Sequence, residues 1–298
     1  MALAKLVSKQ KGRRFLKNLI AEELAEERDV QPLSPHECNE ECAEECRVHT
    51  VRASSMYRIC AREEVLAGLL EVVRKDKVDG NLAMIFQHGH ALHHQLQNEI
   101  LPRLQVIVGQ WRCQWCMKLH GGLKKGVPKE LTLKPRPKRC RRCKKSDFVY
   151  NELSFYDEEL RLSGHNDAFL KQPGYPGLGV GEFKSIGVRG GLEIRKAPNV
   201  GHVIQAQVYM MLSGCRWAKI LYWQKSETGI NALVEHTVEY DEGTVRVIRD
   251  MIRSIWKGLR DRDLPERICA TDDCKRAKGC ALKQACFRYG KVLPQEVT

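Results

Sequence analysis

A small set of polar residues in this 298-residue chain has the types and spacing that hydrolysis of a phosphodiester bond requires. Asp167 lies in one apolar segment, and Glu182 and Lys184 follow in the next, GVGEFKSIG. Two such carboxylates hold a divalent cation, and a neighbouring lysine helps to position or activate a water for attack on phosphate. With His93 upstream in GHALHH, these residues indicate metal-dependent hydrolysis of nucleic acid.

Strands and one helix must position these side chains. Side chains two apart in a β-strand point to the same face, so Glu182 and Lys184 share a face of the strand that their segment predicts. Asp167 can reach the same point if LRLSGHNDAFL pairs with that strand as a hairpin. Gln205 and Tyr209, four apart in HVIQAQVYM, share one face of a predicted helix. They can lean over the site to touch DNA or to orient the lysine.

Each motif also has an interpretation in which it takes no part in catalysis. Glu-x-Lys occurs by chance in many exposed strands, Asp167 can cap a turn, and the glutamine and tyrosine can simply pack. The histidine-rich stretch can be a polar helix surface, in which His90 and His94 compete with His93 for the role of ligand. All the motifs in this order, together with a cysteine framework, favour the nuclease reading.

The motifs resemble the RecB-like branch of the PD-(D/E)XK nucleases, which includes CRISPR-associated and AddB-type enzymes. The resemblance covers about residues 54 to 286, through ASSMYRICAREEVL, GHALHHQLQ, GHNDAFL, GEFKSIG, QAQVY and a terminal cysteine cluster. It departs from the family at Asn166, which stands where proline commonly precedes the aspartate. It implies an α/β restriction-endonuclease-like core, with a central mixed sheet flanked by helices, and exonuclease action on DNA, with single-stranded ends as the expected substrate.

The resemblance also implies a role for each residue. Lys184 would stabilise charge on the scissile phosphate or orient the water, and the helix residues would organise the substrate. The implied catalytic set is His93, Asp167, Glu182, Lys184, Gln205 and Tyr209. The implied ligands of Mg²⁺ or Mn²⁺ are His93, Asp167, Glu182 and the backbone carbonyl of Phe183.

Two other functions fit the same residues. One is a structure-selective endonuclease on this fold, including one that trims DNA for CRISPR integration. The other is a non-catalytic DNA-binding module, against which the intact catalytic set argues. The compact chain also resembles phage-encoded recombination or DNA-degradation enzymes. The expected partners are DNA, as single strands or duplex ends, and a recombination or helicase protein of unknown identity, with no membrane.

Thirteen cysteines form the second strong signal. They are clustered, and the basic, amphipathic N-terminal segment lacks the apolar core of a signal peptide. No apolar run approaches the length of a membrane span. Clustered cysteines in an intracellular protein are typical of metal sites rather than disulfides. We therefore expect a cytosolic protein, in the host cytoplasm if it is phage-encoded.

Two C-x-x-C pairs predict one metal centre. Cys113 and Cys116 lie in WRCQWCMK, and Cys140 and Cys143 lie in KRCRRCKK. Four facing thiolates make a tetrahedral site that suits zinc, and iron remains an alternative, as do a redox pair and reduced surface thiols. The basic, proline-containing stretch between the pairs cannot build a core, so bound metal must supply its folding energy.

Basic and aromatic residues surround these cysteines. They suit phosphate contacts and base stacking, although the charges can also serve only to keep the segment soluble. The predicted DNA-binding residues are Trp111, Trp115, Arg139, Arg141 and Arg142.

The resemblance implies a [4Fe–4S] cluster held by one cysteine before the nuclease core and three after it. Such a cluster staples distant parts of the chain together, which aids folding entropically. Four cysteines follow the core, and Cys269 is preferred to Cys274 for the remaining place because Cys274 lies amid charge in DDCKR. The predicted ligands are Cys60, Cys269, Cys280 and Cys286.

A further group repeats a cysteine every four residues in ECNEECAEEC, so a helix would align the thiols on one face. The group either binds another zinc with a histidine or forms a half-buried thiol stripe. Cys215, after an apolar helix, is predicted to be a buried structural thiol. The members of the group are His36, Cys38, Cys42, Cys46 and His49.

Composition agrees with a single α/β core and small metal-stapled additions. The hydrophobic share of 43% excludes wholesale disorder. The net charge of +13 favours a polyanionic partner, although ribosomal or membrane-surface attachment would give similar charge. The predicted units are an N-terminal helical arm with the Cys/His group (1–50), the helical part of the nuclease domain (51–108), an inserted zinc ribbon (109–146), the PD-(D/E)XK core (147–264) and an iron–sulfur segment (265–298).

Hydrophobic periodicity predicts the order of elements. The first helix is basic and then acidic, and the second has an apolar side that includes Val65, Leu69 and Val73. Helices are expected over about 1–35, 54–75, 81–104, around Gln205 and over 241–259. Strands are expected over about 147–163, 165–170, 179–187 and 191–195, then in AKILYWQKS and LVEHTVEY.

Overall fold

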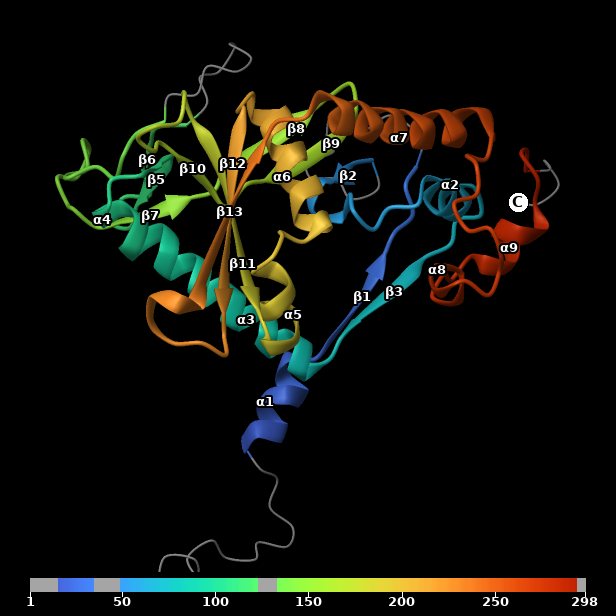
Figure 1. Ribbon diagram of the computed structural model, residues 1–298, viewed down its shortest axis with the longest axis horizontal. Coiled ribbons are helices and arrows are strands. Elements are labelled where there is room, and N and C mark those ends of the chain that lie inside the picture. Colours follow the sequence, from blue (N-terminus) through green and yellow to red (C-terminus); the bar gives the residue numbers. More distant parts are fainter. Residues whose placement is uncertain (1–15, 35–48, 123–132, 294–298) are drawn as a thin grey trace, which may run out of the picture.

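A five-stranded sheet in the order β13-β12-β11-β10-β4 lies at the centre of the molecule (Figure 1). The computed structural model describes residues 16–34, 49–122 and 133–293. Strands β11 and β12 run parallel, and the other neighbours in this sheet run antiparallel. Helix α3 contacts β11, and helix α6 contacts both β11 and β12. This mixed sheet with packed helices agrees with the expected α/β class.

Three smaller sheets accompany the central one. They have the orders β1-β3, β2-β9-β8 and β6-β5-β7. The strands are β1 (Glu26–Val30), β2 (Val51–Arg52), β3 (Arg74–Val78), β4 (Ile107–Val108), β5 (Gln110–Cys113), β6 (Leu119–His120), β7 (Phe148–Asn151), β8 (Ser154–Asp157), β9 (Leu162–His165), β10 (Ala168–Leu170), β11 (Gly179–Ile186), β12 (Trp217–Gln224) and β13 (Leu233–Glu239).

Helices account for most of the remaining regular structure. The α-helices are α1 (Leu16–Leu24), α2 (Ala61–Leu69), α3 (Gly80–Gln95), α4 (Leu101–Arg103), α5 (Val188–Ile194), α6 (Val200–Ser213), α7 (Glu242–Asp261), α8 (Lys275–Lys278) and α9 (Lys283–Arg288). Two short 3₁₀ turns are η2 (Ala53–Ser55) and η4 (Gly229–Ala232), and η3 (Leu96–Ile100) is a π-helical turn. Among these described helices, none combines the length and the apolar character that a bilayer span requires.

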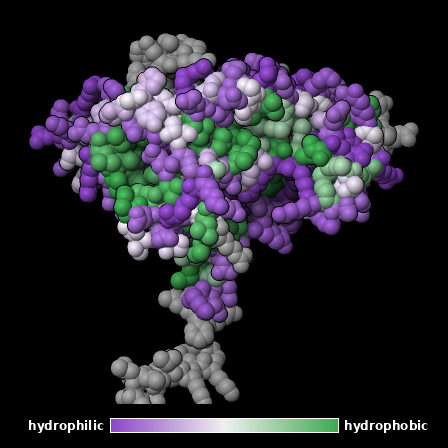
Figure 2. Space-filling model, viewed as in Figure 1, coloured by the Kyte–Doolittle hydropathy of each residue, from purple (hydrophilic) through white to green (hydrophobic). Residues whose placement is uncertain are grey.

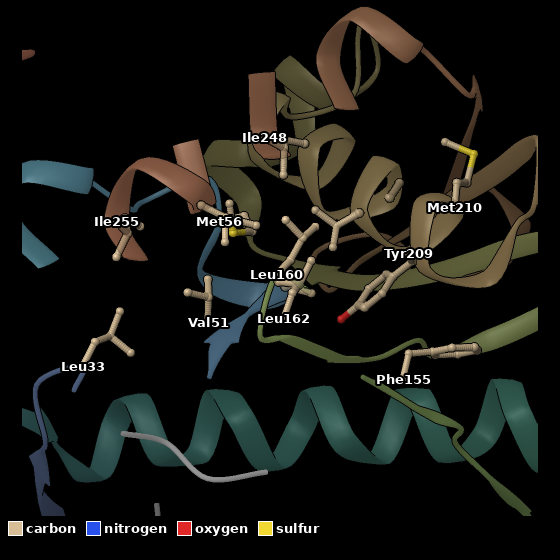
Figure 3. Packing of buried hydrophobic residues seen from close by; sticks show 14 of the residues in the cluster. Leu33, Val51, Met56, Phe155, Leu160, Leu162, Tyr209, Met210, Ile248 and Ile255 are labelled. Atoms are coloured by element: carbon tan, nitrogen blue, oxygen red, sulfur yellow. The ribbon is translucent and has the colours of Figure 1, made fainter. Parts of the chain in front are cut away.

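The main core lies between the central sheet, the small β2-β9-β8 sheet and helices α6 and α7. Helix α7 is amphipathic, and its buried residues recur every three or four positions at Ile248, Ile252, Ile255 and Leu259. Figure 3 shows Ile248 and Tyr209 packed over the strand region that carries Leu162. The opposite side of α7 faces outward, and hydrophilic side chains cover that edge in Figure 2. The apolar stripe thus fixes α7 across α6 and leaves its charged side in water.

Helix α2 packs directly against α7 because a glycine lies at their contact. A Cβ added to Gly68 would lie 2.4 Å from Cδ2 of Leu259 and 2.4 Å from the backbone oxygen of Leu33. Any larger residue would force the two helices apart. Helix α2 also contacts α9, so the close packing joins the start of the core to the C-terminal segment.

Arg62 fastens the C-terminal segment to α2. Its guanidinium, only 3% exposed, donates hydrogen bonds to four backbone oxygens of that segment. We expect Arg62→Met to lower the free energy of unfolding by about 3 kcal/mol, since four partly buried carbonyls lose their donor. Thermal unfolding and limited proteolysis of the C-terminal segment would measure this loss. Arg260→Met, at an exposed position of α7, should leave both unchanged, and an equal effect of the two variants would contradict the prediction.

Most of the predicted elements are present, and three are wrong. The expected helix over 54–75 ends at Leu69, and the expected helix over 1–35 gives way to β1 at Glu26. Strands β1 and β3 pair as an exposed ribbon in which Glu27 bonds Lys75 and Lys77 across the strands. Such cross-strand pairing leaves no apolar periodicity to read. Residues 191–195, expected as a strand, lie mostly in α5.

Candidate metal-dependent active site

The hairpin expected from the sequence brings the two carboxylates together. Strand β10 pairs antiparallel with β11, with Ala168 opposite Gly181. Asp167 therefore lies beside the position of Glu182. The backbone N–H of Phe183 donates to Oδ2 of Asp167 at 2.6 Å, which fixes one oxygen of this carboxylate.

Glu182 is a carboxylate residue in a fully buried position. Its side chain is 0% exposed, and Lys184, two residues along the same face of β11, forms an ion pair with its Oε1. Its Oε2 has no hydrogen-bond partner among the described residues. A buried carboxylate costs several kcal/mol unless its oxygens are paired, so this group is suited to receive a positively charged ligand.

The structure selects one histidine from the cluster. His93 is half-buried, whereas His90 and His94 are exposed. Its Nδ1 lies 3.5 Å from Oδ1 of Asp167, and its ring packs edge-on against Phe183 with the ring centroids 5.9 Å apart. Because side chains alternate along a strand, Phe183 and Glu182 point to opposite faces of β11. His93 therefore lies beside both Asp167 and the Phe183 segment of β11 that follows Glu182.

A third carboxylate, Glu152, completes this group and was not identified from the sequence. Oxygen or nitrogen atoms of His93, Glu152 and Asp167 all lie within 4.8 Å of one another, which is close enough for one metal ion. Gln97 positions Glu152, because its Nε2 donates at 2.7 Å both to Oε1 of Glu152 and to the backbone oxygen of Asp167. No motif surrounds Glu152, which directly follows the short strand β7.

Gln97 reaches this position through the π-helical turn η3. The turn follows His93 by one helical turn and widens the helix over Leu96–Ile100. Single π-turns inside helices occur frequently at functional sites. Asn98, the next residue, accepts a hydrogen bond from the backbone N–H of Tyr150 at 2.6 Å and so holds β7 against the helix.

Burial changes the ionisation of all three central groups. It raises the pKa of Glu182 to about 8, and the nearby charge of Asp167 adds to the rise. Burial likewise raises the pKa of Asp167 to about 7, although Lys184 opposes this. Burial also acts to lower the pKa of Lys184, but the two carboxylates outweigh it and raise that pKa to about 12. The lysine therefore stays protonated, while the carboxyl groups can exchange protons for a cation near neutral pH.

Helix α6 covers the site with three side chains on one face. Gln205 and Tyr209 are 7% and 3% exposed, and Nε2 of Gln205 donates to the tyrosine hydroxyl at 3.1 Å. His202, three residues earlier, was not identified from the sequence; its Nδ1 lies 2.9 Å from the hydroxyl of Tyr222. Burial and the charge of Lys184 lower the pKa of His202 to about 4, so the ring is neutral at physiological pH.

The four cysteines of the two C-x-x-C pairs lie together. Sγ of Cys113 lies 3.5 Å from that of Cys143, Sγ of Cys116 lies 3.5 Å from that of Cys140, and all four lie within 4.8 Å. Tetrahedral Zn–S bonds place sulfur atoms about 3.8 Å apart, so this set has the spacing for a single ion. Nε2 of His120, which the sequence did not single out, lies 3.3 Å from Sγ of Cys140 and can donate to its thiolate.

The two tryptophans beside these cysteines differ in exposure. Trp111 is 0% exposed, donates from its indole N–H to the backbone oxygen of Lys134 at 2.9 Å and packs on Tyr150. Its predicted role in base stacking is therefore wrong, because strand alternation turns the ring into the core. Trp115 is 66% exposed. The three predicted arginines, Arg139, Arg141 and Arg142, are also exposed.

The predicted cluster cysteines line one cavity. Cys60, Cys269, Cys280 and Cys286 border it, although they come from widely separated parts of the chain. Among the described residues, their sulfur atoms do not lie close enough together to form a single-ion group. Cys274 does not line the cavity, and its Sγ accepts from the N–H of Ala277 at 3.4 Å at the start of α8.

Two other cysteine predictions have different outcomes. Cys215 is 5% exposed beside the core, as expected for a structural thiol. Most of the cysteine and histidine group at 36–49 lies outside the described residues, so its role as a metal site stays a prediction.

No family model and no curated protein matches this chain. Among solved structures, it is similar to an alkaline exonuclease (LHK-Exo) from Laribacter hongkongensis, solved also in complex with dAMP, at 12% identity and a TM-score of 0.42 over 71% of this chain and 88% of that chain. A protein named SSO0001 matches at 13% identity and a TM-score of 0.38 over 91% of this chain and 93% of that chain. A phage-related exonuclease from Haemophilus somnus 129PT matches at 11% identity and a TM-score of 0.35 over 71% of this chain and 94% of that chain. Because all these TM-scores lie below 0.5, the function has to be argued from the site itself.

Proposed function

We propose that this protein is a Mg²⁺- or Mn²⁺-dependent deoxyribonuclease that degrades DNA from its ends, with single-stranded ends as the substrate. The observation that carries the proposal is the fully buried carboxylate of Glu182, held beside Asp167 and Lys184 with one oxygen that has no partner among the described residues. A merely structural strand has no reason to bury a carboxylate oxygen without a partner. A site that binds a cation against a phosphate requires one.

The donor set fits a divalent cation. Carboxylate and carbonyl oxygens suit Mg²⁺ and Mn²⁺, and here they come from Asp167, Glu182 and the backbone of Phe183. His93 adds a nitrogen, and Glu152 is an additional candidate from the other side of Asp167. When bound, such a cation would supply an activated water and offset charge on the scissile phosphate.

The remaining residues act on position and charge. Lys184 stays protonated and can donate to a phosphate oxygen or orient the attacking water, because it lies on the same face as the carboxylates. Gln205 and Tyr209 are too deeply buried to follow a DNA strand along the surface, so they organise the interior of the site. The hydroxyl of Tyr222 lies on the strand position opposite Lys184 and is held by His202.

Two further metal groups belong to the proposal. The cysteines at 113, 116, 140 and 143 would hold zinc, which supplies folding energy to a segment with little core of its own. A [4Fe–4S] cluster would be held by Cys60, Cys269, Cys280 and Cys286. Both groups would be structural, because neither set contacts the carboxylates described above.

Digestion of end-labelled DNA by the purified protein tests the function. With Mg²⁺ or Mn²⁺ we expect linear single strands to be degraded and circular single strands to remain intact. Lys184→Ala should lower the rate about 10²- to 10⁴-fold while DNA binding persists, because only charge in the transition state is lost. Lys257→Ala, at an exposed position of α7, serves as the control. Full cleavage by Lys184→Ala would overturn the assignment, and cutting of circles would favour the endonuclease.

A further inference from the structure

We propose that the cysteine ribbon binds the single-stranded end of the DNA before it is cut, by stacking a base on Trp115. The cysteine ribbon is here the sheet β6-β5-β7 with its two C-x-x-C turns. This inference rests on the proposed nuclease function and extends it to the part of the substrate that lies outside the catalytic site.

Within the part of the chain that the structure describes, the cations of the ribbon have no acidic partners. Five exposed cations follow one another around its second turn, and none has an ion pair within the described part of the chain. By contrast, Arg249 and Arg253 on α7 are paired with Glu242 and Glu159. Figure 2 shows hydrophilic side chains at the outer end of the molecule beyond β5, β6 and β7. The unpaired cations are Lys138, Arg139, Arg141, Arg142 and Lys144.

An exposed aromatic ring lies among these charges. Trp115, at the tip of the first turn, is 66% exposed, and Nζ of Lys145 from the second turn lies 4.9 Å from its ring centroid. A tryptophan beside an ammonium can stack a base while the lysine meets the adjoining phosphate. Bases in a duplex are already stacked on one another, so this arrangement favours a single strand over a duplex.

The ribbon is attached firmly to the catalytic site. Strand β7 leads directly from the second cysteine turn to Glu152, and Asn151 donates to Oε1 of Gln110 on β5 at 2.6 Å. Arg136 donates to the backbone oxygen of Asn98 at 2.9 Å, on the same turn that positions Glu152 through Gln97. The chain takes nine residue steps from Cys143 to Glu152 and so spans at most ~30 Å, which one strand of DNA can bridge.

Fluorescence anisotropy tests the proposal by measuring binding to a labelled single strand of about 16 nucleotides. All variants are made in the Lys184→Ala protein. Trp115→Ala should weaken binding roughly 5- to 150-fold, and Trp115→Phe should restore most of it. Binding to the blunt duplex of the same sequence should change little. Arg141→Ala with Arg142→Ala should lower the slope of log affinity against log salt by about 1.4, because two phosphate contacts are lost. The paired Arg249→Ala and Arg253→Ala form the matched control, and metal analysis should find zinc retained in each ribbon variant.

Kinetics of the active protein separate this proposal from the proposed function. Trp115→Ala should raise KM for the long strand, with kcat unchanged and with cleavage of a strand of about 4 nucleotides unaffected. Normal binding and KM in Trp115→Ala, or an equal loss on duplex and single strand, would overturn the ribbon proposal and leave the nuclease standing. A wild-type protein that binds single strands through Trp115 but never cuts would refute the nuclease and leave the ribbon.

Discussion

Replacing Glu182 with glutamine is expected to abolish DNA cleavage without destabilising the metal-free protein at pH 8. The rate should fall at least about 10³-fold, because the site loses a charged ligand for the cation that offsets phosphate charge. The fold should survive, because the variant removes an ionised group that is 0% exposed and has one oxygen with no partner among the residues that the structure describes. A loss of function with no loss of stability is the mark of a residue kept for chemistry.

The stability difference should depend on pH in a defined direction. Burial raises the pKa of Glu182 from its ordinary value of 4.5 to about 8, so the folded metal-free protein binds a proton that the unfolded chain releases. Its stability therefore falls as pH rises from about 4.5 to about 8, and this loss is absent in Glu182→Gln. The melting temperatures of the two proteins should be similar near pH 5 and should diverge in favour of the variant by pH 8. One kcal/mol corresponds to roughly 2–4 °C.

Divalent cations and a surface control complete this test. Mn²⁺ should raise the melting temperature of the wild type more at pH 8 than at pH 6, and should raise that of Glu182→Gln much less. Glu235→Gln removes a carboxylate that is 51% exposed and pairs with Lys219 outside the site, so it should keep full activity. Persistent cleavage by Glu182→Gln would refute the site. A lower melting temperature of the variant at pH 8 would show that the pair with Lys184 stabilises the fold.

The sequence predicted the part of the site that local rules govern. Two-residue alternation placed Glu182 and Lys184 on one face, and the hairpin placed Asp167 beside them, because both follow from strand geometry. The residue before Asp167 shows the limit of such rules. Asn166, the departure from the family pattern, uses its Nδ2 to donate to the backbone oxygen of Ala168 and so shapes the turn before β10.

The residues that the sequence did not reveal depend on tertiary contacts. Glu152 joins the group only because Gln97, on a π-helical turn, holds it against Asp167. The spacing of apolar residues does not predict a π-helical turn, and Glu152 belongs to no sequence motif. The prediction for Trp111 was wrong for a different reason. An aromatic residue near basic charge suggested DNA binding, but Trp111 occupies an inward-facing position of β5 and is buried. A signal did exist for His202, which lies on the helix face of Gln205.

The preference for Cys269 over Cys274 rested on local charge and stays a prediction, and the two cysteines differ in their position relative to the cavity. Cys269 borders the same cavity as Cys60, Cys280 and Cys286. Cys274 instead begins α8, where its Sγ accepts from the N–H of Ala277 at 3.4 Å. A serine can take over this cap, so Cys274→Ser should keep the start of α8 intact.

We therefore expect Cys269→Ser to lose its iron and Cys274→Ser to keep it. Wild type purified without oxygen should be brown, and iron per chain with the visible spectrum would report the difference. Loss of the cluster opens a link between α2 and the C-terminal segment, and by analogy with a disulfide such a link is worth about 4–5 kcal/mol for a long loop. The melting temperature of Cys269→Ser should accordingly fall by roughly 10–20 °C, with that of Cys274→Ser near the wild type. Iron lost only from Cys274→Ser would reverse the assignment, and a wild type without iron would remove the cluster altogether while leaving the carboxylate site untouched.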